Sequence, residues 1–161
     1  MRILFIIFLA AFIGFSCVKP KTKNPIPVIE FADFSDPHKT PRGDTATMVL
    51  NYEDGDGDLF VDKTSEGPNL IFTPYYYDLA SKTYKASFNV IINDTTRITM
   101  SIKQPDNGYY KGKSIKGQIY VPLLEFRPND ATKIIRFSGF MVDLAGHKSN
   151  AVVSPSYTLN F

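Results

Sequence analysis

Apolar and polar residues alternate along most of the chain from Val28 onward. In 45–52 every second residue is Ala, Met, Leu or Tyr, and in 97–103 Ile98, Met100 and Ile102 alternate with polar residues. Successive side chains of a strand point to opposite faces, so a period of two indicates strands with one buried face. β-Branched and aromatic residues are frequent in these runs and turn-forming residues separate them, which also favours strands.

The pattern as a whole predicts an antiparallel β-sandwich. We expect strands near residues 28–34, 45–53, 69–78, 84–92, 97–103, 117–124, 133–143 and 150–161, with a polar turn at 93–96. No stretch carries the 3.6-residue apolar stripe of a helix, and short strands that follow one another directly are typical of sandwiches. Pro74, Pro122 and Pro155 fall within strand-like runs and should mark edges or bulges, because proline cannot donate to a ladder.

The N-terminal segment has a different pattern, with Arg2 followed by an unbroken apolar run up to Phe15. The run has the length of a secretory signal sequence and is too short to span a bilayer. Gly14 and Ser16 precede Cys17, the only cysteine of the chain. This arrangement resembles the lipobox of bacterial lipoproteins, except that Phe15 stands where a small residue is usual. The resemblance implies that residues 1–16 are a signal peptide and that Cys17 is lipidated. The alternative is an uncleaved anchor that ends in a buried Cys17 thiol.

Residues 17–27 are expected to be the lipidated cysteine and a tether, and residues 28–161 the sandwich domain. The tether contains three prolines and three lysines in positions 18–27, a composition that favours extended polyproline II and cannot bury a core. At about 3.1 Å per residue it would hold the domain up to roughly 30 Å from the lipid. The chain would then contact the membrane through its lipid anchor.

Composition excludes several classes of function. Lys and Arg number 18 against 16 Asp and Glu, and removal of a signal peptide takes away only Arg2, which leaves 17 against 16. This balance argues against a nucleic-acid partner, which requires a concentrated basic face. Once Cys17 is acylated, no thiol remains for a disulfide, a nucleophile or a metal site. Packing of aromatic residues must therefore supply much of the stability, and the chain has 13 Phe and 9 Tyr.

The C-terminal segment 141–149 resembles the V-x-D-x-A-G-N-x-S hairpin that closes many bacterial immunoglobulin-like domains. In that hairpin Asp143 would end the penultimate strand, and Gly146 would take the left-handed conformation that glycine adopts at little cost. His147 replaces the usual Asn. Together with the lipobox and the acidic run at 54–58, the chain is similar to small immunoglobulin-like cell-envelope lipoproteins of Gram-negative bacteria. The resemblance implies an immunoglobulin-like fold and an envelope location.

The acidic run 53–58 (Glu-Asp-Gly-Asp-Gly-Asp) is the strongest chemical motif. Glycines between the carboxylates allow a loop to turn its oxygens toward one point, as Ca²⁺ requires. The spacing is not that of an EF-hand, because Leu59 stands where glycine is needed. In an immunoglobulin-like sandwich this loop and the last hairpin lie at the same end, so the candidate ligands are Asp54, Asp56, Asp58 and Asp143, with Asp62 a weaker one. The alternative is a solvated acidic turn without an ion.

Aromatic and catalytic motifs give a weaker indication. Tyr109 and Tyr110, next to Gly and Lys, are candidates for binding a glycan or peptide, although core and cross-strand packing is the simpler explanation for the tyrosines. At least one of the three tyrosines 75–77 should be buried, because adjacent strand residues alternate faces. His38 and His147 do not stand in a metal-binding or catalytic spacing, and no nucleophile elbow, P-loop or dinucleotide motif is present. We therefore expect no catalytic residues.

The function expected from the sequence is that of a non-enzymatic envelope module, structural or engaged in recognition, with Ca²⁺ as a candidate stabilising ion. The runner-up is an accessory lipoprotein that binds a glycan or a protein segment, and a hydrolase is a distant third. Val18 follows Cys17, so the Asp that commonly retains lipoproteins in the inner membrane is missing. This favours the outer membrane and leaves open which of its faces the domain occupies.

Overall fold

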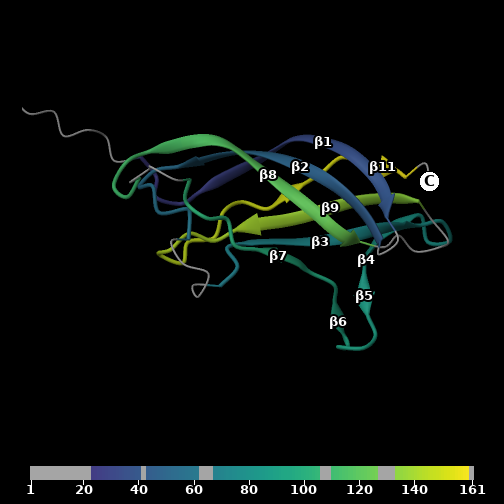
Figure 1. Cartoon of the computed structure of the whole chain (residues 1–161). Coiled ribbons are helices and arrows are strands. Elements are labelled where there is room, and N and C mark those ends of the chain that lie inside the picture. The colour runs from purple at the N-terminus through teal and green to yellow at the C-terminus, as the bar shows by residue number, and fades with distance from the viewer. Residues whose placement is uncertain (1–22, 41–42, 62–66, 106–109, 127–132, 160–161) are drawn as a thin grey trace, which may run out of the picture.

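The computed structural model of the chain describes residues 23–40, 43–61, 67–105, 110–126 and 133–159. In this part the chain forms strands, turns and loops and no helix (Figure 1). The strands are β1 (Val28–Thr40), β2 (Gly43–Asp54), β3 (Leu70–Asp78), β4 (Thr83–Ala86), β5 (Phe88–Asn89), β6 (Asp94–Thr95), β7 (Ile98–Met100), β8 (Ile115–Phe126), β9 (Ile134–Met141), β10 (Val152–Val153) and β11 (Tyr157–Thr158). A helix able to cross a membrane is accordingly not found among the described residues.

The strands form an antiparallel β-sandwich, which confirms the expected fold class. One sheet has the order β1-β2-β8, and the other has the order β10-β9-β3-β4, with β7 beside β3 and β11 beside β9. Read along the chain, these orders correspond to A-B-E and G-F-C-C′ of an immunoglobulin-like sandwich. Figure 1 shows the two sheets as two layers, with β5 and β6 outside them.

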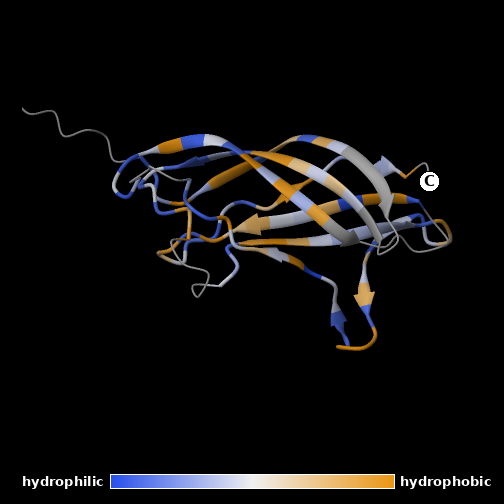
Figure 2. Cartoon of the chain, in the orientation of Figure 1, coloured by the Kyte–Doolittle hydropathy of each residue, from blue (hydrophilic) through white to orange (hydrophobic). Residues whose placement is uncertain are grey.

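The core lies between the two sheets and follows the alternation of the sequence. Along β3 and β9 every second residue is buried, and the buried set includes Leu70, Phe72, Ile135 and Phe137. Across the sandwich the ring of Phe34 stacks on Phe137 with centroids 5.8 Å apart. Figure 2 shows hydrophobic residues recurring along the strands of both layers. Burial of these side chains is the main source of stability in a chain of this kind.

The prolines confirm two expectations and refine a third. Pro122 lies in β8, an edge strand, and Pro155 interrupts the edge between β10 and β11. Pro74, in contrast, lies in β3, which has neighbours on both sides. It is tolerated because the neighbouring edge is broken opposite it: β4 pairs with residues 75–78 of β3, and β7 pairs with residues 70–72.

Two of the expected strand boundaries were wrong. The strand expected over 84–92 ends at Asn89, and the chain turns at 90–93 instead of at the polar residues 93–96. The strand expected over 150–161 is reduced to the short pieces β10 and β11. In the first case the apolar residues of 90–92 belong to a turn, although an apolar run normally indicates a strand.

Candidate metal centre

The acidic loop begins where β2 ends, at Asp54, and two glycines let it fit against neighbouring backbone. Gly57 has a φ of +75°. A Cβ atom on Gly57 would lie 2.0 Å from the carbonyl oxygen of Tyr110, and one on Gly55 would lie 2.0 Å from the carbonyl oxygen of Asn24. Only glycine fits at these two positions. The Asp56 carbonyl also accepts a hydrogen bond from the backbone N–H of Gly112, so the turn after Tyr110 covers the loop.

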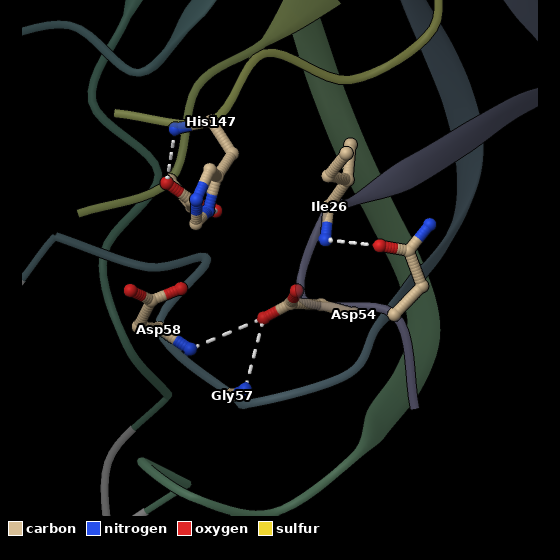
Figure 3. A network of polar contacts seen from close by, with 7 residues as sticks. Ile26, Asp54, Gly57, Asp58 and His147 are labelled. Carbon is tan, nitrogen blue, oxygen red and sulfur yellow. Dashed lines mark hydrogen bonds and ion pairs between the residues drawn. The ribbon is translucent and has the colours of Figure 1, made fainter. Parts of the chain in front are cut away.

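Asp54 organises the loop from within. Its side chain is almost fully buried, at 1% exposure, and its Oδ2 accepts hydrogen bonds from the backbone N–H groups of Gly57 at 3.0 Å and Asp58 at 3.1 Å. These bonds fold the loop back over the end of β2 (Figure 3). Its Oδ1 is also buried, yet has no hydrogen-bond partner among the described residues. A buried carboxylate oxygen without a partner is costly unless something else compensates its charge.

The three loop carboxylates converge. Asp54, Asp56 and Asp58 each offer an oxygen, and these oxygens lie within 4.8 Å of one another. The Oδ1 atoms of all three are buried and lack a hydrogen-bond partner within the described chain. Carboxylate oxygens at this spacing, contributed by an irregular Gly-containing loop, are the ligand type and geometry that Ca²⁺ accepts.

The last hairpin lies against this loop. The backbone N–H of Leu144 donates to the Asp58 carbonyl oxygen at 3.0 Å, which ties the segment after β9 to the segment after β2. Asp143 is buried, and its two carboxylate oxygens contact the backbone N–H of His147 at 2.7 Å and the His147 Nδ1 at 2.9 Å. Asp143 therefore lies beside the loop, but both of its oxygens are engaged in closing its own turn. Gly146 in that turn has a φ of +90°, as the motif predicted.

The electrostatics of the cluster are those of excess negative charge. Burial, followed by the charges of Asp143 and Asp56, raises the pKa of Asp58 to about 6. Burial and the Asp56 charge raise the pKa of Asp54 as well. The hydrogen bond to Asp143 raises the pKa of His147, which stabilises the charged imidazolium at the rim. Like charges held together in a partly buried site are relieved by protonation or by a bound cation.

The remaining candidate residues are placed as follows. Tyr110 packs on Phe60, with ring centroids 6.3 Å apart, and lies at the edge of the core. Cys17, Asp62 and Tyr109 lie outside the described residues. Of the three tyrosines 75–77, the middle one, Tyr76, is buried, which confirms that at least one of them belongs to the core.

The sequence reasoning missed an aromatic face on the second sheet. Tyr75 and Tyr77 lie on the face of β3 opposite the core, and the ring of Tyr84 meets Tyr77 at 5.2 Å. The guanidinium carbon of Arg136 lies 3.8 Å from the centre of the Tyr84 ring and 5.9 Å from that of Tyr75. Alternation alone places Tyr75 and Tyr77 on one face. The contribution of Arg136 depends on the pairing of Tyr75 with Arg136 across β3 and β9, which the sequence does not reveal.

No family model, curated protein or solved structure matches the chain. The chemistry of the acidic loop is therefore inferred from its own geometry. Three buried carboxylate oxygens without a partner in the described chain, beside the carboxylate of Asp143, are a donor set of the kind that can bind a hard cation.

Proposed function

We propose that this protein is a lipid-anchored, non-enzymatic module of the bacterial cell envelope whose β-sandwich is stabilised by Ca²⁺ at its acidic end. The observation that carries the proposal is the set of buried, unpartnered carboxylate oxygens of Asp54, Asp56 and Asp58. An ion there would join the loop after β2 to the hairpin that carries Asp143, two segments far apart in the sequence. The role of the ion would be structural, because an ion that joins two loops stabilises the folded domain.

The position of the tether supports this role. Lys23 Nζ lies 2.7 Å from a carboxylate oxygen of Glu53, and the backbone of Asn24 lies directly against Gly55. The segment that leads from the lipidated Cys17 therefore reaches the sandwich beside the acidic loop. A cation in the loop would stiffen the end of the domain by which the protein is held to the membrane.

The pairing of Asp143 with His147 does not require a catalytic role. Asp143 accepts hydrogen bonds from the backbone and faces the ring of the same histidine, four residues on, so the pair is explained by the turn that it closes. Among the described hydroxyls nearby, Ser149 donates to the Asn150 carbonyl and accepts from the Met141 N–H. A hydroxyl used in this way supports the hairpin instead of acting as a nucleophile.

Thermal unfolding with and without Ca²⁺ tests the proposal. Sites of the extracellular type bind at about 10⁻⁴–10⁻³ M, so Ca²⁺ at about tenfold above Kd should stabilise the fold by roughly 1.4 kcal/mol. We expect the Tm to rise by a few degrees and to return with chelator. Asp56→Asn should reduce the response, whereas Asp94→Asn, in another turn, should not. Mg²⁺ should have less effect because it gives up its waters reluctantly. A Tm independent of Ca²⁺ would leave the loop as a solvated turn.

A second candidate function is recognition of a glycan or peptide, and the clustering of Tyr75, Tyr77 and Tyr84 with Arg136 favours it. Aromatic rings beside a cation on an outer sheet face can stack on sugar rings or planar peptide groups. Calorimetric titration with soluble peptidoglycan fragments, comparing the wild type with Tyr84→Ala and with Tyr120→Ala on the other sheet, tests this alternative. Binding that only Tyr84→Ala weakens would support it, and no heat of binding would exclude it for this class of glycan.

A further inference from the structure

A hairpin that belongs to neither sheet stands out from the sandwich. β5 pairs only with β6 in the described chain, through Phe88 with Thr95 and Asn89 with Asp94. Figure 1 shows the hairpin projecting on the side away from β1, β2 and β8, and Figure 2 shows that its tip is hydrophobic. Two pairs form a ladder too short to be stable by itself, so the hairpin depends on its base and on whatever its tip contacts.

Pro74 determines where the hairpin leaves the sheet. The Pro74 carbonyl accepts a hydrogen bond from the Ser87 N–H at 2.9 Å, so the missing N–H of Pro74 faces the same edge. The chain beside Pro74 therefore finds no N–H donor on it, and it leaves the sheet between β4 and β7. The Thr96 N–H donates to the Ser87 carbonyl at 2.8 Å and closes the base of the hairpin. The base is thus fixed to the sandwich, and the tip is held away from it.

The tip presents large aliphatic side chains to the surroundings. Val90, Ile91 and Ile92 are 81%, 90% and 63% exposed, and Phe88 below them is 57% exposed. Exposed apolar residues are common singly, but four on one projecting hairpin form a patch with a contact function. The residues that follow the tip are polar: Asn93, Asp94 and Thr95.

We propose that this tip, residues 90–92 with Phe88, inserts into the lipid bilayer and gives the domain a second membrane contact. From Ile91 to Phe88 the hairpin covers at most about 10 Å at 3.3 Å per residue, which falls within the depth of about 5–10 Å to which apolar faces enter the boundary between headgroups and acyl chains. With the tip inserted, Asp94 would lie at the level of the headgroups. Its negative charge is paired there with Arg97, whose guanidinium lies 3.5 Å from the Asp94 carboxylate.

Two observations favour a bilayer over a protein pocket. Lys23 and Asn24 lie against the acidic loop, so only residues 18–22 are left to bridge to the lipid, and at 3.1 Å per residue they would span up to about 15 Å. A lipid anchor would therefore hold the sandwich close to the bilayer, where a projecting apolar tip can meet the surface. This step rests on the lipid anchor proposed above. In addition, the outer face of this sheet carries Tyr75 and Tyr77 on β3 and Arg136 on β9, and tyrosine and arginine are side chains that settle at the level of the headgroups.

A tryptophan reporter tests the insertion, because the chain has no Trp of its own. The full chain carrying Ile91→Trp is reconstituted into phosphatidylcholine vesicles with ordinary or brominated acyl chains. The matched control is Tyr120→Trp, 63% exposed on β8 of the other sheet. We expect the emission of Ile91→Trp to shift to the blue and to be quenched by the brominated lipid, and the emission of Tyr120→Trp to remain that of a tryptophan in water. Adding Val90→Asp and Ile92→Asp to Ile91→Trp should abolish the quenching.

Equal, water-like emission at both positions would overturn the inference. So would a blue shift that brominated lipid does not quench and that grows with protein density, since this would show that the tip contacts a second copy of the chain. The lipid anchor is judged separately, by acyl labelling of Cys17. In the reconstituted full chain the apolar segment 1–15 remains, so the reporter can be read even if Cys17 carries no lipid.

Discussion

Asp54 shows how a single residue can serve the fold and a site together. One of its oxygens binds two backbone N–H groups and shapes the loop, while the other is buried without a partner in the described chain. An asparagine could preserve part of the first role but not the negative charge. At this scale burial and the repulsion between neighbouring carboxylates disfavour the charged loop, and a bound cation or a proton would relieve both effects.

The raised pKa values of the loop carboxylates predict how the stability of the metal-free protein depends on pH. The folded pKa of Asp58, about 6, lies above its ordinary value of 3.8, so the folded state holds more protons between these values. The free energy of unfolding should therefore fall as the pH rises through this window, and the raised pKa of His147 adds a further fall above pH 6.5. Thermal unfolding in metal-free buffer should give a higher Tm at pH 5 than at pH 7.

Asp58→Asn is the control for this prediction. It should raise the metal-free Tm at pH 7 and weaken the dependence between about pH 4 and 6, while it leaves the parts due to Asp54 and His147. Asp78, whose pKa is lowered to about 2 chiefly by its hydrogen bond to Lys85, acts below this window and does not interfere. Wild-type stability that is unchanged, or lower, at pH 5 would show that burial and the neighbouring carboxylates do not raise the pKa of Asp58.

The loop glycines give a second prediction at the residue scale. Gly57→Ala and Gly146→Ala both place a side chain at positive φ, which costs about 1–2 kcal/mol. The Cβ atom at position 146 meets nothing within 4 Å, whereas at position 57 it meets the carbonyl oxygens of Tyr110 and Lys113. Chemical denaturation should therefore show Gly57→Ala to be less stable than Gly146→Ala by a further 1–3 kcal/mol or so. Equal losses would mean that the Tyr110 turn moves away freely.

At the scale of elements, alternation was enough to predict most of the sandwich. β2, β3, β8 and β9 lie within a few residues of their expected positions, because each has one face in the core and one outside. The same rule failed at 90–92, because these apolar residues are exposed in a turn, whereas their sequence pattern predicts a strand. Convergence of Asp54, Asp56 and Asp58 could be anticipated from the glycine spacing. The burial of the loop depends on contacts between segments far apart in the sequence, such as the hydrogen bond from the Gly112 N–H to the Asp56 backbone carbonyl, which the spacing does not reveal.

The hairpin should be dispensable for folding. Residues 88–95 add nothing to the buried core, and Ser87 and Thr96 already form a hydrogen-bonded pair. Replacing 88–95 by Asn-Gly, a two-residue turn that suits such a pair, should change the free energy of unfolding by no more than about 0.5 kcal/mol. Denaturant titration measures this. A loss of several kcal/mol would show that the hairpin supports β4 and β7 instead of projecting as an independent element.

At the scale of the whole molecule, the acidic loop and the apolar hairpin, on which the proposed roles depend, lie at separate places on the sandwich. The acidic loop is at the end where Lys23 and Asn24 enter, and the apolar hairpin projects from the gap between β4 and β7, the two strands that pair with β3. An anchored N-terminus alone would leave the domain free to rotate about its tether. A cation that stiffens the entry point and a hairpin that enters the bilayer would together restrict that rotation and fix which face of the sandwich points outward.

The proposed lipid anchor predicts the effect of Cys17→Ala. Acyl chains contribute about 0.8 kcal/mol per buried CH₂, and a bilayer contact by the hairpin tip is far smaller in apolar area, so the lipid should dominate attachment. In cells fed a palmitate analogue, the wild type should be labelled and Cys17→Ala should not, and Cys17→Ala should either keep its signal peptide or leave the membrane fraction. The Asn-Gly hairpin replacement is the matched control, since it should remain labelled and membrane-bound. Label on Cys17→Ala would place the lipid elsewhere and contradict the anchor, whereas loss of membrane attachment in the hairpin replacement alone would show that the tip is the main anchor.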